Sequence, residues 1–331
     1  MGLSYKSRKL RFYSSGIAGL ALPDRLFRRR LSRWLAGLSQ EQVKALIPRV
    51  EYYCRLTTPF EIGPEAVAIG DFRYEKRGAY YLDTRNIVRH FDPALRFHYQ
   101  FGDIVHACER PTVVKSRPID RHDRWENACN VLLKLNRVRH FQFIARDRSQ
   151  ASKRPAVVWR GHCYHENRRA MLRRFHDHPR MDVGHVHSDP AVGSGYRAPM
   201  SLEEQLRYRF VLSLEGKDVA TNLKWILSSN SVCMMPEPRY ETWFMEGTLK
   251  PWVHYVPLAP DCADLEEKME TCLEQPALCE EITRNARAHV APFLDARRER
   301  RIALLVMAKY FALSNQLTLP SRLNVLLAAP S

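Results

Sequence analysis

Apolar residues in the second half of the chain come in short runs, separated by segments with a helical period. The runs predict strands at 156–159, 181–186, 210–214, 232–235 and 254–258. The intervening segments predict helices at 166–175, 202–208, 219–227 and 263–272. This alternation favours a parallel sheet covered by helices, in which ligands bind beside the carboxyl ends of strands. The loops 160–168, 215–222 and 237–243 are therefore candidate ligand sites.

The first half carries a weaker pattern. Short apolar runs predict strands at 66–69, 79–82, 96–101, 112–114 and 141–144, and a helix at 127–135. The tail at 280–313 reads as one long helix, and the polar segment 149–155 is the best candidate for a domain boundary. The chain as a whole is therefore expected to be α/β, with about two domains.

Residues 24–38 predict an amphipathic helix. Phe27, Leu31, Trp34, Leu35 and Leu38 fall on one helical stripe, with arginines on both sides of it. A Trp within such a stripe is typical of a helix that lies on a membrane surface. An ordinary helix packed on its own domain shows the same pattern, so both interpretations stay open.

Charge and cysteine content narrow the class of protein. The 331 residues carry a formal net charge of +16, and residues 1–50 contribute +9 of it. Such an excess indicates an anionic partner: a membrane surface, a phosphorylated substrate or a nucleic acid. The eight cysteines form no Cys-x-x-Cys pair, which favours free thiols in a reducing compartment. No apolar run reaches the length of a membrane span, and the short run at 17–22 is a poor match to a secretion signal.

Two turns have the chemistry to hold a diphosphate. Arg160 and Gly161 follow a strand and precede a helix with Arg168, so backbone N–H groups and a guanidinium can meet phosphate oxygens. Glu215, Gly216 and Lys217 offer a second such turn. The chain has neither a P-loop nor a dinucleotide-binding glycine motif.

Single residues add two further candidates. Asp103 follows a predicted strand end, where a general base or a turn-capping carboxylate is expected. His176, His178, His185 and His187 have spacings that metal sites use, but a polar loop is the favoured interpretation. No Asp-x-Asp pair is present, so no metal is expected and cationic side chains are expected to hold phosphates.

Five ordered segments resemble glycosyltransferase family 90, and most closely its bacterial lipopolysaccharide branch. They are Ala156–Gly161, Arg209–Trp225, Ser229–Val232, Leu249–Pro257 and Asp264–Glu267. The resemblance covers roughly residues 50–290, and it implies a GT-B fold with two Rossmann-like domains that face each other across a cleft. The C-terminal helix would return toward the N-terminal domain.

The resemblance also implies roles for particular residues. Asp103 matches the family's catalytic base, and Arg160, Gly161, His162 and Arg168 match its diphosphate contacts. The loop with Glu215, Gly216, Lys217 and Asn222 matches a second nucleotide contact, and Glu241 in the third loop is a further substrate-binding candidate. Animal members have an arginine at the position of Asn222, so Lys217 or Lys224 would supply the phosphate charge here.

The expected domains are a basic segment at 1–50, an acceptor-side domain at 51–152 and a nucleotide-sugar-binding domain with the terminal helix at 153–331. The expected activity is inverting, metal-independent transfer of glucose or xylose from a UDP-sugar to a lipopolysaccharide core or related glycan, without a cofactor. The expected location is cytoplasmic, on the inner face of the membrane beside a lipid-linked acceptor. An inactive membrane scaffold and a basic nucleic-acid-binding protein are the alternatives, although no nucleic-acid-binding motif is recognisable.

Overall fold

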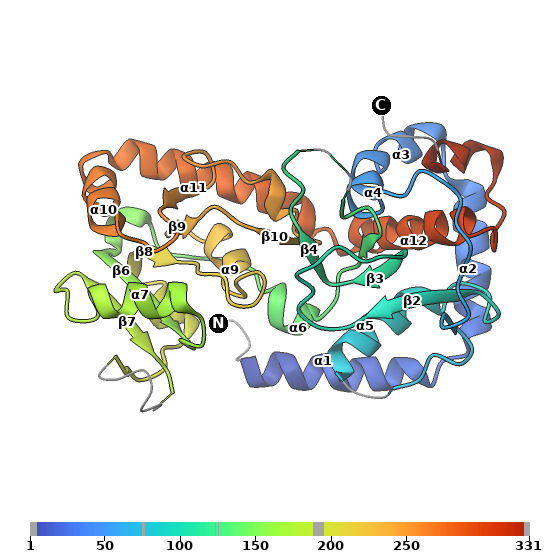
Figure 1. Cartoon of the computed structure of the whole chain (residues 1–331), viewed down its shortest axis with the longest axis horizontal. Helices are drawn as coiled ribbons and strands as arrows, with labels where there is room; N and C mark the ends of the chain where they lie inside the picture. Colours follow the sequence, from blue (N-terminus) through green and yellow to red (C-terminus); the bar gives the residue numbers. More distant parts are fainter. Residues whose placement is uncertain (1–4, 75–76, 123, 125, 188–194, 328–331) are drawn as a thin grey trace. The chain divides into compact units, whose positions relative to one another are not determined.

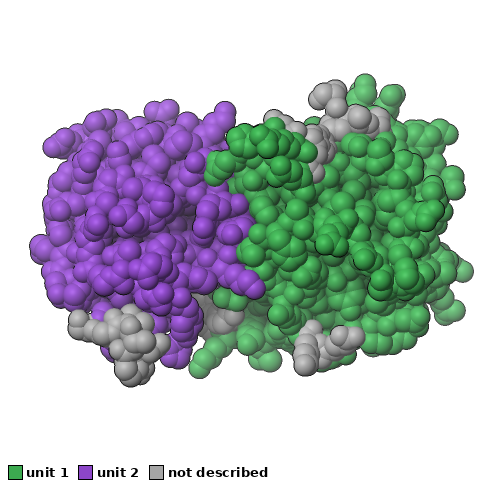
Figure 2. Space-filling model, in the orientation of Figure 1, with its two compact units in different colours: residues 1–139, 295–331 green, residues 140–294 purple. Residues whose placement is uncertain are grey.

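The computed structural model describes residues 5–74, 77–122, 124, 126–187 and 195–327 (Figure 1). The chain forms two compact units, unit 1 with residues 1–139 and 295–331, and unit 2 with residues 140–294 (Figure 2). Unit 2 begins before the polar segment 149–155, and the chain re-enters unit 1 after Leu294. The α/β class expected from the sequence is confirmed.

Unit 2 is built on a five-stranded parallel sheet in the order β11-β9-β8-β6-β7. Its strands are β6 (Arg154–Gly161), β7 (Met181–His185), β8 (Tyr208–Leu212), β9 (Val232–Pro236) and β11 (Val256–Leu258), and β10 (Tyr240–Thr242) lies outside this sheet. Its helices are α7 (Glu166–Phe175), α8 (Leu202–Gln205), α9 (Leu223–Leu227), α10 (Leu265–Glu274) and α11 (Pro276–Val290). Short 3₁₀ turns occur at Gln150–Ser152, Glu246–Thr248 and Ala291–Leu294.

Helices cover this sheet through one apolar core. Helix α7 packs on β7, and α9 and α11 pack on β9 (Figure 1). Trp159 and Phe210 from the strands join Met171 of α7 and Met269 of α10 in the buried cluster. Each buried side chain of this size contributes roughly 1.5 to 3 kcal/mol to folding. The core therefore fixes the strand ends from which the candidate loops extend.

Unit 1 contains a four-stranded sheet in the order β1-β2-β3-β5. Strands β2 (Arg96–Gln100), β3 (Thr112–Val114) and β5 (Asn130–Leu132) are parallel, and β1 (Val67–Ala68) is antiparallel to β2. The short strand β4 (Ser116–Pro118) follows β3. The helices are α1 (Tyr5–Leu20), α2 (Asp24–Gly37), α3 (Gln40–Lys44), α4 (Ile47–Tyr53), α5 (Gly78–Val88), α6 (Arg137–His140, which ends at the first residue of unit 2) and α12 (Ala296–Leu313), with a 3₁₀ turn at Ser321–Leu327.

Four sequence expectations in or next to unit 1 are wrong. The run at 79–82 lies in helix α5, whose residues are buried on almost every side, so the run shows no helical stripe. The segment 127–135 contains strand β5, which is fully buried in the sheet, and no strand forms at 141–144. The long helix expected at 280–313 is two helices, because Pro292 interrupts it and the Asp295 carboxylate caps α12 by accepting from the N–H groups of Arg297 and Arg298.

Helix α2 forms as expected, and its apolar stripe packs within unit 1. Leu31, Leu35 and Leu38 are buried, and the Phe27 ring lies 5.1 Å from the His90 ring. Asp24, at the helix start, accepts hydrogen bonds from Arg85, which lies in α5, and from Arg89, the residue that follows α5. Of the two interpretations of this stripe, the structure therefore supports the ordinary packed helix.

All eight cysteines are free, as the sequence suggested. Within the described ranges, no helix combines the length and the apolarity that a membrane span requires.

Candidate functional site

Asp103 lies at the carboxyl edge of the unit 1 sheet. Strands β2 and β3 are parallel and end at Gln100 and Val114, so the residues that follow them emerge at the same edge. Lys115, directly after β3, donates from Nζ to Asp103 Oδ1 over 2.6 Å. The Lys115 side chain is 2% exposed and that of Asp103 is 38% exposed. The arrangement presents to solvent a carboxylate whose negative charge is supported by a buried ammonium.

Gly102 shapes the loop that carries Asp103. Its φ of 125° lies in a region that side chains rarely adopt, and a Cβ there would meet Arg77 Nη1 at 2.1 Å. Arg77 also donates a hydrogen bond to the Phe101 carbonyl. Glycine is therefore required at this turn, and it sets the direction in which Asp103 leaves the strand.

Arg168 joins two of the candidate loops of unit 2. Its guanidinium donates to the carbonyl oxygens of His162 at 2.9 Å, Leu214 at 2.6 Å and Glu215 at 3.2 Å. The loops after β6 and β8 are therefore tied together by one side chain of α7. In this structure the guanidinium of Arg168 is hydrogen-bonded to the loop carbonyls, so its N–H groups are not all available to a ligand.

Arg160 and Gly161 end strand β6 and are held within unit 2. Arg160 donates to Asp182 Oδ1 and to the Asp182 carbonyl, both over 2.6 Å, and to the Ala198 carbonyl over 3.0 Å. Partial burial acts to raise the pKa of Asp182, but hydrogen bonds from Tyr208 and Arg160 bring it below its usual value. A Cβ on Gly161 would meet the Trp159 ring at 2.5 Å, so only glycine fits there.

Glu215 joins the second and third loops. Its carboxylate accepts from the backbone N–H of Arg239 over 3.0 Å, from Arg239 Nε over 3.0 Å and from the Tyr240 N–H over 3.3 Å. Burial raises the pKa of Glu215 against the lowering effect of Arg239. Gly216 lies directly beside the guanidinium of Arg168.

The lysines expected to supply phosphate charge lie in different environments. Lys224 is fully buried and its Nζ contacts Glu246 Oε1 at 2.5 Å, so a carboxylate already balances its charge. Lys217 is exposed on the loop after β8, and no described residue forms an ion pair with it. Asn222, just before α9, bonds through Nδ2 to the Leu212 carbonyl over 2.8 Å and thus fixes the turn. Of the two lysines, Lys217 is the one positioned to meet an anion.

Glu241 lies in β10 and is 1% exposed.

The histidines separate into two groups. His178 pairs with Glu266 and His176 with Asp177, whereas His185 and His187 lie near His162 at the ends of β6 and β7. Among the described residues, no three His, Cys, Asp or Glu side chains are grouped as a metal ion would require.

The family model for glycosyl transferase family 90 matches residues 134–316, more than half of the chain. The chain belongs to this family. It is 45% identical to the O-glucosyltransferase LpsA of Dichelobacter nodosus over 269 residues, which cover 81% of this chain and 83% of LpsA. It is also 31% identical to Protein O-glucosyltransferase 2 of Danio rerio, over 22% of this chain and 14% of that protein. An uncharacterised protein 027R of Frog virus 3 shares 37% identity over 25% of this chain and 9% of its own length.

As a member of family 90, the chain is a glycosyltransferase, and the resemblance in the sequence is confirmed. The sequence pointed to Asp103, Arg168 and the glycine turns, but not to Lys115 or Arg239 as their partners. Lys115 directly follows a predicted strand, which was the available signal. The pairing of Arg239 with Glu215 joins positions 24 residues apart, and no spacing rule links them.

Proposed function

We propose that the protein transfers a sugar from a UDP-sugar to a hydroxyl group of a lipopolysaccharide core or related glycan, with inversion and without a metal ion. The observation that carries this proposal is the solvent-facing Asp103 carboxylate held by Lys115 at the carboxyl edge of a parallel sheet. Unit 1 takes the acceptor and unit 2 takes the donor, as the two domains of a GT-B fold do.

In the reaction, the acceptor oxygen attacks the anomeric carbon from the face opposite UDP. A new C–O bond forms, the bond to the diphosphate breaks, and UDP leaves with its electron pair. Asp103 accepts the hydroxyl proton as the attack proceeds, which is the role of a general base. Lys115 keeps the carboxylate oriented, so the base does not have to be ordered during the reaction.

The loops of unit 2 bind the leaving diphosphate. Backbone N–H groups of the loops after β6 and β8 meet the phosphate oxygens, and the exposed Lys217 brings a positive charge. Arg168 acts through the loop carbonyls that it holds, and is thus a positioning residue for this site. Fixed dipoles and charges near the diphosphate stabilise the charge that develops there.

A panel of UDP-sugars tests this function. UDP-glucose and UDP-xylose are the expected donors, and the name of the LpsA relative favours glucose. A true donor should raise the melting temperature, because it binds only the folded protein, and should release UDP when acceptor is present. ADP-glucose and GDP-glucose are the controls. Stabilisation without turnover would support an inactive scaffold, and no response to any UDP-sugar would contradict the proposal.

The enzyme works at an anionic membrane surface through helix α1. Leu10 and Ile17, one above the other on the helix, are 72% and 62% exposed, and the exposed Lys6, Lys9 and Arg11 lie close to them. Each basic residue near an anionic leaflet contributes about 1 kcal/mol. Helix α1, rather than α2, offers the apolar face that is still available to lipid.

Vesicle sedimentation tests this location. The protein should sediment with phosphatidylglycerol vesicles, not with neutral ones, and high salt should release it. Leu10→Ser with Ile17→Ser should abolish sedimentation, whereas Leu294→Ser, at a residue 57% exposed in unit 2, should not. Binding that persists in the double variant would rule out α1 as the membrane surface.

A further inference from the structure

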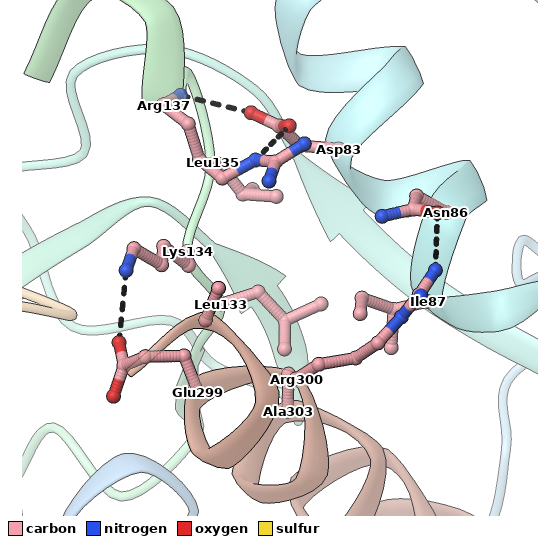
Figure 3. Close-up of a pocket in the computed structure, with 11 residues that line it drawn as sticks. Asp83, Asn86, Ile87, Leu133, Lys134, Leu135, Arg137, Glu299, Arg300 and Ala303 are labelled. Atoms are coloured by element: carbon pink, nitrogen blue, oxygen red, sulfur yellow. Dashed lines mark hydrogen bonds and ion pairs between the residues drawn. The ribbon is translucent and has the colours of Figure 1, made fainter. Parts of the chain in front are cut away.

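A pocket of about 240 Å³ opens in unit 1 beside the end of strand β5 (Figure 3). Helix α5 contributes Asp83 and Asn86, the segment after β5 contributes Lys134 and Arg137, and the first turns of α12 contribute Glu299 and Arg300. The polar ends of these side chains surround an interior whose base includes Leu133 and Ile87.

Positive charge exceeds negative charge around this pocket. Arg137 donates through its backbone N–H and its Nε to Asp83, over 2.9 and 2.6 Å. Glu299 is shared by two cations, accepting from Lys134 over 2.9 Å and from Arg49, outside the pocket, over 2.5 Å. Among the residues that line the pocket, three cations (Lys134, Arg137 and Arg300) therefore face two carboxylates (Asp83 and Glu299).

Arg300 is the cation that remains unbalanced. Its Nη2 donates to the amide oxygen of Asn86 over 2.8 Å, and no carboxylate among the residues that the structure describes pairs with it. Arg300 is exposed at the mouth of the pocket, and partial burial of its side chain, followed by the positive charges of Arg137, Arg30 and Arg89, lowers its pKa. An anion in the pocket would relieve this repulsion and receive a forked pair of hydrogen bonds.

The pocket lies at the same edge of the unit 1 sheet as Asp103. Strands β2, β3 and β5 are neighbours and parallel, so Asp103 after β2 and Lys134 after β5 emerge at the same edge of one sheet. Two strand spacings separate these strand ends, a distance of about 10 Å. One or two sugar units span a distance of this size, and they would separate the reacting hydroxyl from the charged substituent.

We propose that this pocket binds an anionic group, a phosphate or a carboxylate, carried by the acceptor glycan. The role as acceptor site rests on the proposed function, but binding of the anion by Arg300 does not. The pocket would then select acceptors that carry a negative charge near the hydroxyl to be glycosylated.

Anion binding to the full-length protein tests the proposal directly. Inorganic phosphate and acetate are titrated separately at constant ionic strength, with calorimetry and melting temperature as readouts. Arg300→Gln should weaken binding of the preferred anion at least tenfold. Arg297→Gln, at an exposed position of the same helix, should change it less than twofold.

A second variant separates loss of the site from misfolding. Asn86→Asp places a carboxylate against Arg300 and should also abolish anion binding, while the arginine stays in place. Loss of binding in both variants supports the site, and the anion that binds identifies the group. No binding by the wild type, or equal binding by wild type and Arg300→Gln, would overturn the proposal.

Measurements of UDP and UDP-sugar binding distinguish failure of this proposal from failure of the proposed function. Stabilisation by UDP should be the same in Arg300→Gln as in the wild type, because the donor loops lie in unit 2. If UDP-sugars failed to bind while phosphate binding still required Arg300, the transferase proposal would fall and the anion site would stand.

Discussion

Replacing Arg168 with alanine should loosen the loops of unit 2 that we propose bind the donor. The change removes three hydrogen bonds from a guanidinium to main-chain carbonyls, at 2.6, 2.9 and 3.2 Å. A single hydrogen bond to a charged group contributes about 1.5 to 3 kcal/mol. The freed carbonyls can partly rehydrate at the loop surface, so we expect a total loss of about 3 kcal/mol rather than the full sum.

For a unit of this size, 3 kcal/mol corresponds to a melting temperature lower by about 6 to 12 °C. UDP affinity should fall about tenfold, since the loops lose their common support, which corresponds to about 1.4 kcal/mol. Arg168→Lys should recover only part of both effects, because an ammonium lacks the planar fork.

Calorimetric melting and UDP titration measure these effects, with Arg169→Ala as the matched control. Arg169 lies next to Arg168 on α7 and pairs with Glu166 at the surface, where the two side chains are 40% and 63% exposed. Such a pair contributes about 0 to 1 kcal/mol. Equal melting temperatures for the Arg168→Ala and Arg169→Ala proteins would refute the positioning role of Arg168.

Three further outcomes follow from the structure. Lys224→Met leaves Glu246 buried without its cation, so urea unfolding should show a loss of about 3 to 5 kcal/mol, against a smaller loss for Lys268→Met, whose side chain is 25% exposed and pairs with Glu267. Burial, with the nearby Arg300, lowers the pKa of His90 to about 4. The folded protein therefore keeps this ring neutral, and stability should fall by up to about 3 kcal/mol as the pH drops from about 6.5 to about 4, a loss that His90→Gln should remove. Transfer should continue in EDTA, and activity that returns only with manganese would contradict the metal-independent mechanism.

The strongly patterned parts of the fold could be predicted from the sequence. The strands and helices of unit 2 alternate along the chain, and helix α2 carries a clear apolar stripe. The sequence predicts a strand within helix α5 and a helix over strand β5, and both predictions are wrong because the two elements are buried on nearly every side. A short apolar run without a polar face has no period that distinguishes a helix from a strand.

The candidate site, like the fold, could be predicted only in part from the sequence. Position after a strand singled out Asp103 as a candidate base, and the glycine turns singled out the loops that we propose bind the donor. The partners of these residues could not be found, since Lys115 and Arg239 reach them through tertiary contacts. Nor does charge alone distinguish the exposed Lys217 from Lys224, whose ion pair with Glu246 is made in the interior.

The most direct test of the account is the turnover of Asp103→Asn with the donor found in the UDP-sugar panel. The amide cannot accept the hydroxyl proton, so transfer should slow by a factor of about 100 or more. UDP affinity should be unchanged and the melting temperature should fall by only a few degrees, because the 38% exposed side chain can still accept from Lys115. Asp71→Asn, at an exposed carboxylate of unit 1, serves as the control and should retain full activity. Turnover of Asp103→Asn at the wild-type rate would contradict the central claim that this carboxylate is the base.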